Sequence, residues 1–493
     1  MHWRPLWLGW VAWLIACSSP KGDESDKGDK GAAILQPAGW DAELRVAVAQ
    51  DLSPDPHVFE TNLTASIAQL EILDGIQTEV FAYNGSVPGP EIRVAKGDRV
   101  IVHFTNELPE PTTVHWHGVR VPNHVDGVPG VTQPEVQPGE TFTYDFIAPD
   151  AGTFWYHPHV RSAEQVGAGL YGTIVVTDPD EPEGLGDELT LVLSDMTLKD
   201  DGQLQTEVLG GPLELLFGRE GNVLLVNGKV NPELKARSGR RQRWRVLNAS
   251  RTRYYQLAID GQQFVRFAGD GGMSEHPIPV DTVVVAPSER VEVTFTPNAE
   301  PGATLPVRWV PYDRGFGTLL REEVQVMTLK LSDEEPYVEA PLPPLGRTIE
   351  PLDLSNAKEL TMELTMSEIG DTVELGINGV PHWEAPPIEA TLGETHIWTF
   401  KNTFDFAHPM HLHGFFFQVL SMDGAPPAVR EWKDTVDVHV EGETTIAVHF
   451  DERPGMWMLH CHILDHAEIG MMTMVHLSPE GEHDDSAHKE HKH

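Results

Sequence analysis

The sequence predicts an all-β protein made of three similar domains. Two observations carry this prediction: the strand-like runs are short and separated by turn-forming residues, and one pattern of turns recurs three times along the chain. No stretch shows the long amphipathic period of a helix, which would be the main competing structure.

The candidate strands are rich in β-branched side chains. They include residues 99–104 (RVIVHF), 282–285 (TVVV) and 444–448 (TTIAV), with Gly, Pro, Asn and Asp between such runs. β-branched residues favour strands because their side chains pack well on a pleated surface. Short strands at this spacing are typical of β-sandwiches and β-barrels.

An internal repeat predicts the number of domains. Each copy has an Asn-Gly pair, then a glycine, a strand-like run, and an asparagine nine residues after that glycine. The copies are Asn84-Gly85, Gly97 and Asn106; Asn227-Gly228, Gly239 and Asn248; and Asn378-Gly379, Gly393 and Asn402. They predict three domains, at residues 50–180, 185–335 and 350–478. Acidic or proline-rich stretches at 178–183 and 340–344 fall where linkers are expected.

The composition narrows the choice of partners. The 493 residues carry a formal charge of −40 at pH 7, and the acidic residues are dispersed. This pattern argues against a nucleic-acid partner and indicates a solvated acidic surface. The only cysteines are Cys17 and Cys461, so apolar cores and metals, not disulfides, are expected to stabilise the fold. We expect a monomer.

The N-terminus predicts export from the cytoplasm. An apolar run at residues 6–16 is too short for a permanent membrane span. Its last residues and Cys17 (LIAC) resemble the lipobox of bacterial lipoproteins. Residues 1–17 are therefore interpreted as a lipoprotein-type signal peptide, with cleavage before Cys17 and lipidation of its thiol. An ordinary signal peptide cut elsewhere is the alternative.

The two ends of the mature chain are predicted to lack a fold of their own. Residues 18–49 are interpreted as a flexible tether, because Ser, Gly, Lys and Asp are frequent there. Ser18 after the lipidated cysteine favours a periplasmic protein anchored to the outer membrane. Residues 479–493 form a His-rich polar tail.

Four His-x-His pairs are the most informative feature of the sequence. The first repeat contains His115-Trp116-His117 and His157-Pro158-His159, and the third contains His411-Leu412-His413 and His460-Cys461-His462. The middle repeat has none. Two histidines spaced in this way on a strand point to the same face, which suits binding to neighbouring metal ions. A single pair could be a coincidence or a core pair, but four at repeat-equivalent positions favour a shared metal site, and eight imidazoles suit three copper ions.

Cys461 predicts a different kind of copper site. A thiolate with two imidazoles and a distant thioether is the ligand set of blue-copper electron-transfer sites, and His408, His466 and Met471 are available to complete it. In a strand, Cys461 points to one face while His460 and His462 point to the other. The tripeptide would then connect this copper to the multinuclear site. A buried cysteine beside two core histidines remains the alternative for this stretch alone.

Taken together, these motifs resemble those of three-domain multicopper oxidases of the bacterial laccase type. The similarity covers essentially the whole chain after about residue 50. It implies three cupredoxin-like Greek-key β-sandwich domains, with a trinuclear copper cluster between the first and the third. It also implies four copper ions: one type 1, one type 2 and a type 3 pair.

The resemblance assigns each ligand by its motif position. It implies type 1 copper at His408, Cys461 and His466 with axial Met471, and type 2 copper at His115 and His411. It implies one type 3 copper at His117, His157 and His462, and the other at His159, His413 and His460.

The resemblance also implies an activity. A phenol-like compound or an aromatic amine would give single electrons to type 1 copper, Cys461 with His460 and His462 would pass them on, and O2 would be reduced to water. Asp126 matches a carboxylate that the family uses in proton delivery, although Asp-Gly is also a common turn. A second such carboxylate, found in some relatives directly after the type 1 histidine, is replaced here by Ala467. Glu468 follows one position later.

Other functions stay open from the sequence. One alternative is a metallo-oxidase that oxidises Cu(I) or Fe(II) in metal tolerance. Another is a non-enzymatic periplasmic copper store or electron carrier. An electron carrier would need only the blue-copper ligands, which would leave the eight other histidines unexplained. Asp434, in the stretch WKDT, is expected to have a structural role.

Overall fold

The computed structural model describes residues 35–205, 212–315, 322–369 and 372–479. The predicted signal peptide and all but the first residue of the predicted His-rich tail lie outside these ranges. Within them, strands form six sheets and the helices are short, which confirms the all-β prediction. In this part of the chain no helix combines the length and apolar character needed to cross a bilayer.

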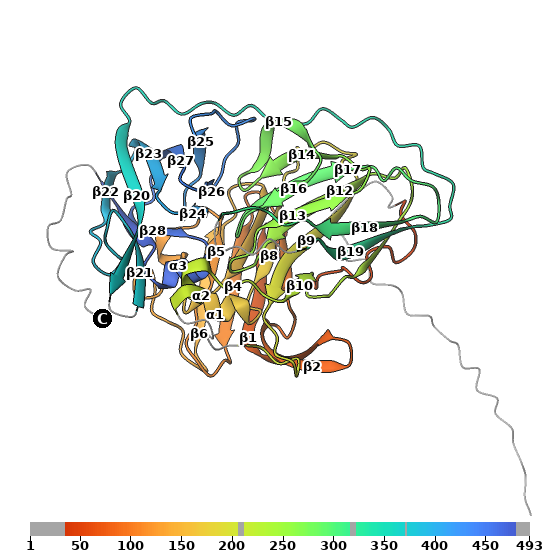
Figure 1. Ribbon diagram of the computed structural model, residues 1–493, viewed down its shortest axis with the longest axis horizontal. Helices are drawn as coiled ribbons and strands as arrows, with labels where there is room; N and C mark the ends of the chain where they lie inside the picture. Colours follow the sequence, from red (N-terminus) through yellow and green to blue (C-terminus); the bar gives the residue numbers. More distant parts are fainter. Residues whose placement is uncertain (1–34, 206–211, 316–321, 370–371, 480–493) are drawn as a thin grey trace, which may run out of the picture. The chain divides into compact units, whose positions relative to one another are not determined.

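The first domain packs two four-stranded sheets, with strand orders β2-β1-β4-β6 and β3-β8-β7-β5 (Figure 1). Pairs β1/β4 and β3/β8 are parallel and the other pairs are antiparallel. Its elements are β1 (Val58–Leu73), β2 (Ile76–Tyr83), β3 (Gly89–Ala95), β4 (Arg99–Asn106), β5 (His115–His117), the 3₁₀ turn η1 (Asn123–Val125), β6 (Thr141–Ile147), β7 (Gly152–His157), α1 (Ser162–Gly167) and β8 (Gly172–Thr177).

The second domain has sheets of order β10-β9-β12-β17-β14-β15 and β11-β19-β18-β13-β16. Pairs β9/β12 and β11/β19 are parallel, as the equivalent pairs are in the first domain. Its elements are β9 (Asp187–Met196), α2 (Pro212–Phe217), β10 (Val223–Val226), β11 (Glu233–Ala236), β12 (Gln242–Asn248), β13 (Tyr255–Ile259), β14 (Phe264–Gly269), β15 (Gly272–Val280), β16 (Val283–Val285), β17 (Arg290–Phe295), β18 (Thr304–Trp309) and β19 (Val324–Leu331).

The third domain repeats the plan with sheets β21-β20-β23-β27-β25 and β22-β29-β28-β24-β26. Pairs β20/β23 and β22/β29 are again parallel. Its elements are β20 (Lys358–Ile369), β21 (Thr372–Ile377), β22 (Ile388–Thr391), β23 (Thr395–Asn402), β24 (His408–Leu412), β25 (Phe417–Met422), β26 (Thr435–Val438), β27 (Glu443–His449), β28 (Gly455–Cys461), α3 (Leu464–Glu468) and β29 (Met472–Ser478).

The sequence repeat has the same structural role in each domain. Each repeat asparagine at the end of β4, β12 and β23 donates its side-chain amide to two or three backbone carbonyls and accepts a backbone N–H from two residues later. Each Asn-Gly pair takes positive φ at both residues, the conformation of a tight turn that Asn and Gly tolerate. The repeat therefore marks positions where backbone polar groups need a fixed partner.

The predicted tether at residues 18–49 is wrong over its described part, which packs on the folded domains. Trp40 and Leu44 are buried in the core of the second domain. The Lys235 N–H donates to the Trp40 carbonyl, and the Asn227 amide donates to the Leu44 carbonyl. Composition missed this because two apolar side chains are enough to attach an otherwise polar segment when a core accepts them.

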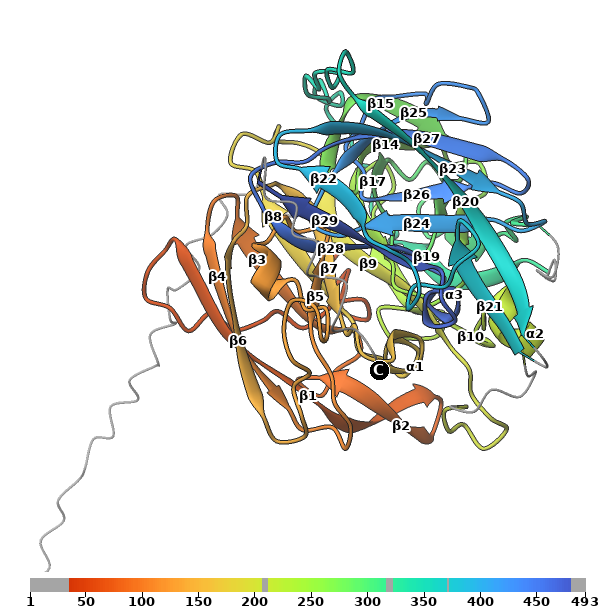
Figure 2. The same cartoon turned by 90° about the vertical axis from the view of Figure 1, so that its left-hand side faces the viewer.

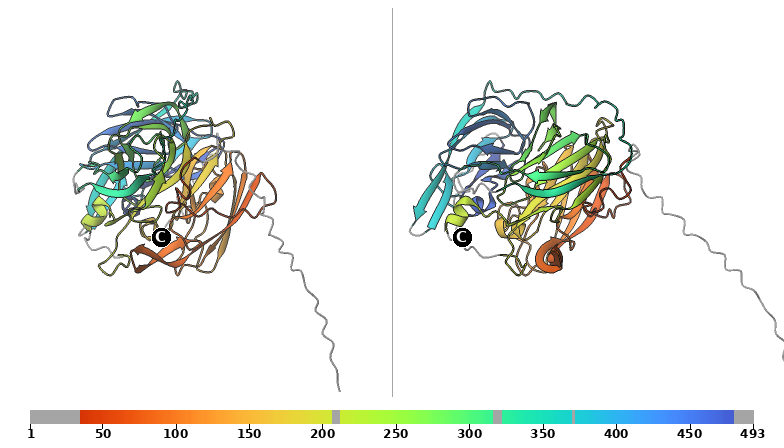
Figure 3. Two further views of the ribbon diagram at one scale, coloured as in Figure 1. Left: turned by 90° about the vertical axis from the view of Figure 1, so that its right-hand side faces the viewer. Right: turned by 45° about the vertical axis from the view of Figure 1, so that its right-hand side comes forward.

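The three domains contact one another. Figure 2 shows β28 of the third domain beside β5 and β7 of the first, and the views in Figure 3 show the green strands of the second domain against both neighbours. Ring contacts link His117 to His411 across the first and third domains, and an ion pair links Arg290 of the second domain to Asp434 of the third. The predicted copper ligands lie along these interfaces.

Candidate metal centres

The four His-x-His pairs lie at the ends of paired strands. His115 pairs with His157 across β5 and β7, and His411 pairs with His460 across β24 and β28. The middle residues of three pairs point into domain cores: Trp116 in the first domain, Leu412 and Cys461 in the third. Because side chains alternate along a strand, the flanking histidines point out of each core. The apolar middle residue thus fixes the direction of the two imidazoles.

The eight imidazoles converge between the first and third domains. Ring centroids of His115 and His413 lie 3.9 Å apart, and those of His117 and His411 lie 3.7 Å apart. His462 lies 5.1 Å from His117. All eight rings are buried except that of His159, which is partly exposed. The two domains therefore form one site that neither contains alone.

Hydrogen bonds leave one nitrogen of several rings free for a metal. The Nδ1–H groups donate to backbone carbonyls: His115 to Asp126 (2.7 Å), His157 to Pro158 (3.0 Å), His411 to Asp434 (2.9 Å) and His460 to Cys461 (2.9 Å). Among the described residues no group bonds to the buried Nε2 of His115, His157 or His411. Buried nitrogens without a partner, on rings fixed by their other nitrogen, are the arrangement of metal-binding histidines.

In His117 the nitrogen without a hydrogen-bond partner among the described residues is Nδ1 instead of Nε2. Its Nε2 lies 3.2 Å from the Asp434 carboxylate, while its buried Nδ1 has no partner in the described structure. The ligand atoms of His159, His413 and His460 lie within 4.8 Å of one another, as do those of His115, His117 and His157. Groups of this size can hold metal ions between them.

Burial keeps these rings neutral, as metal binding requires. Burial and the neighbouring imidazoles lower the pKa of His157, His413, His460 and His462 well below the usual value, and that of His159 to about 3. A neutral imidazole has a lone pair to donate, whereas a protonated one has none.

His408, Cys461 and His466 form a second, separate centre. The Cys461 Sγ lies 3.6 Å from His408 Nδ1 and 3.5 Å from His466 Nδ1, and the two Nδ1 atoms are 3.2 Å apart. Three donors about 2.0–2.3 Å from a central ion in a plane are separated by roughly 3.5 Å, so these distances fit a trigonal ion. Met471 is fully buried in the same core cluster as Cys461. Burial raises the pKa of the Cys461 thiol, so the thiolate needs a metal cation to stabilise it.

The second centre is closed to direct contact from solvent. His408 and His466 are both fully buried. The Nε2–H of His466 donates to the Leu216 carbonyl in α2 at 2.8 Å, so the outer edge of this ring faces protein.

Asp126 lies at the cluster, where the sequence predicted a proton-delivery residue. Its Oδ2 lies 2.8 Å from His413 Nδ1, and its backbone carbonyl accepts from His115. Burial by itself would raise the pKa of Asp126, but His413 and His115 outweigh burial and lower it. A Cβ on the next residue, Gly127, would lie 2.0 Å from the Val114 carbonyl, so this close approach requires glycine.

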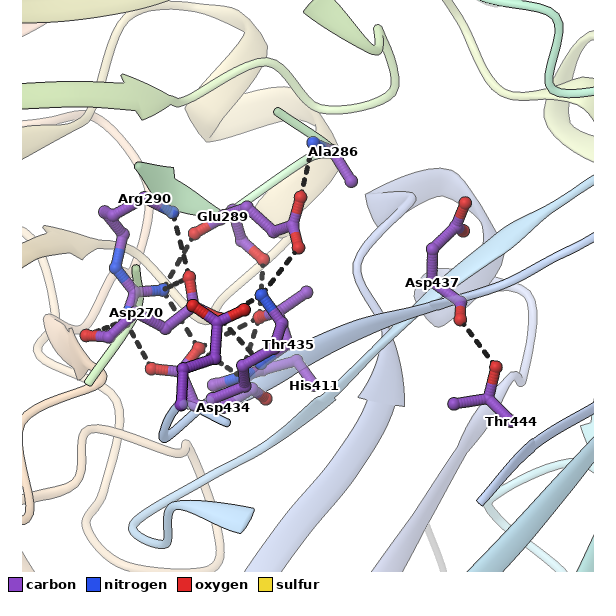
Figure 4. Close-up of polar contacts among 12 residues, drawn as sticks. Asp270, Ala286, Glu289, Arg290, His411, Asp434, Thr435, Asp437 and Thr444 are labelled. Atoms are coloured by element: carbon purple, nitrogen blue, oxygen red, sulfur yellow. Dashed lines mark hydrogen bonds and ion pairs between the residues drawn. The ribbon is translucent and has the colours of Figure 1, made fainter. Parts of the chain in front are cut away.

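Asp434 is the functional residue that sequence reasoning underestimated. It contacts two predicted ligands: its carboxylate lies 3.2 Å from His117 Nε2, and its carbonyl accepts from His411. Arg290, from the second domain, forms a two-pronged ion pair with this carboxylate (Figure 4). Burial opposes ionisation of Asp434, but Arg290 and His117 hold its pKa well below the usual range.

The domain without ligand histidines thus supports the cluster through Arg290. The guanidinium is fully buried and also donates to the carbonyls of Thr153, Ser288 and Asp270. No local signal marks Arg290 in the sequence, because its partner Asp434 lies 144 residues away. For Asp434, the only sign of a role in the sequence was its position in the stretch WKDT, just before β26.

Glu468 does not take the place of the carboxylate missing at Ala467. Its side chain is exposed, and its Oε1 accepts the N–H of Ala163 at the start of α1. Ala467 itself is buried.

Comparisons with known proteins agree with this geometry. Family models described as multicopper oxidase match residues 64–181, 187–304 and 351–481. A multicopper oxidase of Mycobacterium tuberculosis is 32% identical over 478 residues, covering 88% of this chain and 90% of that protein. The chain belongs to the multicopper oxidases.

Solved multicopper oxidases share the fold. The enzyme from Pseudomonas thermotolerans has a TM-score of 0.72 and 33% identity, over 85% of this chain and 99% of the other. A multicopper oxidase of Campylobacter jejuni, described as a metallo-oxidase, has a TM-score of 0.77 and 29% identity, over 88% of this chain and 94% of the other. The cupredoxin-like fold and the four-copper cofactor predicted from sequence are those of this family.

In this multicopper oxidase the trigonal group His408, Cys461 and His466 has the donors expected for type 1 copper. The group His159, His413 and His460 also coincides with a predicted type 3 set, whereas His117 and His157 group with His115, not with the predicted His462. The assignment of single imidazoles to the type 2 and type 3 ions therefore stays a prediction. Copper held by His408, Cys461 and His466 would exchange single electrons, and copper held by the imidazoles between the first and third domains would supply the chemistry for activating O2.

Met471→Leu is expected to leave the type 1 site assembled and to raise its reduction potential by about 0.1 V, because the axial thioether stabilises oxidised copper. A redox titration that follows the blue absorption measures the shift. Met362→Leu, fully buried in the same core cluster, is the control and should leave the potential unchanged. An unshifted potential in Met471→Leu would show that the thioether is not a ligand.

Asp434→Asn is expected to lower the affinity of the cluster for copper about 10–100-fold, as loss of a partner that orients a ligand does. Competition with a copper chelator measures this affinity. Asp405→Asn, at an exposed carboxylate of the same domain, should change it less than twofold. Equal affinities in the two variants would contradict an orienting role for Asp434.

Proposed function

We propose that the protein oxidises phenol-like compounds or aromatic amines one electron at a time and uses four electrons to reduce O2 to water. The main support is the connection between the two centres. Cys461 belongs to one, and its chain neighbours His460 and His462 belong to the other. Adjacent residues thus give electrons a covalent path between two buried centres.

The protein's own residues position the metals and handle protons. The backbone carbonyls that accept from Nδ1 fix the ring orientations, and burial excludes bulk water from both centres. Asp126 is proposed to pass protons to the cluster, since its Oδ2 bonds to His413 while its buried Oδ1 has no hydrogen-bond partner among the described residues.

Copper content and oxygen uptake test the proposal together. Copper-loaded protein should contain four coppers per chain and consume one O2 for every four molecules of 2,6-dimethoxyphenol oxidised, without peroxide. Release of peroxide would contradict four-electron reduction. One copper per chain and no uptake would favour the electron carrier or copper store instead.

A metallo-oxidase is the second candidate. It is supported by the similarity to the Campylobacter jejuni protein described in those words, and by the full burial of His408 and His466. Steady-state kinetics separate the two proposals. A high kcat/KM for Cu(I) or Fe(II) with negligible turnover of phenols would reject the phenol oxidase.

We further propose that the protein is a periplasmic lipoprotein attached to the outer membrane through Cys17, and that it acts as a monomer. The support is the lipobox-like stretch that ends at Cys17. Membrane fractionation of the wild type and of Cys17→Ala tests the attachment. Equal recovery of both proteins in the soluble fraction would contradict it.

A further inference from the structure

A cavity of about 270 Å³ lies between the second and third domains, and none of the predicted copper ligands lines it. Its walls are largely apolar and include Val284, Val291, Met422, Pro427 and Val429. Val284 and Pro427 are exposed, so the cavity reaches the surface there. Cavities of about 150 Å³ can hold benzene, and this one is large enough for a single substituted ring.

One wall of the cavity is aromatic. Tyr254 and Tyr312 stack with their rings 3° from parallel and their centroids 5.1 Å apart, and both line the cavity. Tyr254 also packs in a cluster with Ala407, the residue before the type 1 ligand His408. Flat rings of this kind favour an aromatic ligand in an offset-stacked position.

The ionisable groups of the cavity already have ionisable partners, with one exception. Arg266 pairs with Glu431 at 2.6 Å, and Lys433 pairs with Glu289 at 2.8 Å. His439 contacts Asp423. These groups are therefore already occupied.

The exception is Asp437. The Tyr254 hydroxyl donates to its Oδ1 at 2.7 Å, and no hydrogen bond to Oδ2 is found among the described residues. The backbone carbonyl of Asp437 accepts from Thr444, and the side chain points away from that contact (Figure 4). Burial raises the pKa of Asp437 to about 6. A carboxylate oxygen at an apolar cavity favours a ligand with a hydroxyl or amino group.

The cavity lies close to the type 1 centre through β26. Val436 and Asp437 line it, and in this strand Val438 pairs with His408 and Val436 pairs with Met410. Val436 belongs to the same core cluster as Cys461. Because both type 1 imidazoles are buried, this cavity is a place where a donor can approach the centre without touching its ligands.

We propose that this cavity binds the reducing substrate as a single hydroxylated or aminated aromatic ring, stacked on the Tyr254–Tyr312 pair with its polar group hydrogen-bonded to Asp437. This inference rests on the proposed phenol and aromatic amine oxidation and adds the binding site. It also predicts selectivity: rings with a donor group bind better than the same rings without one.

Calorimetric binding of 3-nitrophenol to the copper-loaded protein tests this site, because this phenol is mainly neutral at pH 7 and resists oxidation. We expect one molecule to bind per chain. Val429→Phe, which fills the cavity, should weaken binding at least tenfold. Val380→Phe, in a separate cavity of the third domain, is the matched control and should change it less than twofold. Equal binding to the two variants would overturn the proposal.

Asp437→Asn gives a second, independent test. The wild type should bind 3-nitrophenol several-fold more tightly than nitrobenzene, and the variant should lose this preference. If Asp437→Asn still binds 3-nitrophenol more tightly than nitrobenzene, the proposed hydrogen bond is overturned. This test does not depend on Val429→Phe, whose failure to fold would show as a loss of its blue absorption.

Oxygen uptake with ferrocyanide as the electron donor, measured on the wild type, distinguishes failure of the proposed oxidase activity from failure of the proposed substrate site. No uptake would reject the proposed oxidase itself. Uptake without any binding of 3-nitrophenol would reject only the cavity as the substrate site.

Discussion

Cys461→Ser is expected to lose the intense blue absorption and all detectable oxidase activity. A serine hydroxyl is a harder and weaker copper ligand than a thiolate, and it lacks the sulfur-to-copper charge transfer that gives the colour. The cluster is expected to keep part of its copper, because its eight imidazoles come from other residues of β5, β7, β24 and β28 and from the residues that follow these strands. Absorption spectra and copper analysis on purified protein measure both effects.

The matched control for Cys461→Ser is Met362→Leu, which changes the same core without touching a ligand. It should keep both colour and activity. Blue absorption that persists in Cys461→Ser would contradict the type 1 assignment. Loss of all copper would contradict the view that the two centres assemble separately.

Arg290→Met is expected to lower the free energy of unfolding by about 3–5 kcal/mol, because it leaves the buried Asp434 carboxylate without its cation. The pair is fully buried, and Asp434 cannot move into water to recover solvation. Copper affinity should fall as well, since Asp434 orients His117 and His411. Denaturant unfolding with and without copper measures the two effects.

Arg308→Met is the control for Arg290→Met. Arg308 lies in the same domain and pairs with Asp260 and Glu323, whose side chains are 76% and 46% exposed. Exposed ion pairs contribute only about 0–1 kcal/mol, so this variant should unfold almost like the wild type. Equal destabilisation by the two substitutions would show that the burial of Arg290 is not what makes its pair important.

The sequence determined the fold class and the histidines and cysteine that gather in the two candidate metal centres. Both follow from short-range regularities: strands recur with their turns, and in a strand the residue between two histidines points the opposite way from them. Trp116, Leu412 and Cys461 point into cores for this reason, and their flanking histidines face the domain interface. The asparagine repeat is also a short-range regularity, because each asparagine side chain donates to a backbone carbonyl four or five residues away.

The tertiary structure alone decided which residues surround those donors. Arg290 reaches Asp434 across two domains, Leu216 covers His466, and Tyr254 meets Asp437 at the edge of a cavity. Trp40 and Leu44 also find their core only in the folded second domain. These partners lie far apart in the sequence, so no local period or motif encodes their contact. They meet only because the packing of whole domains brings their strands together.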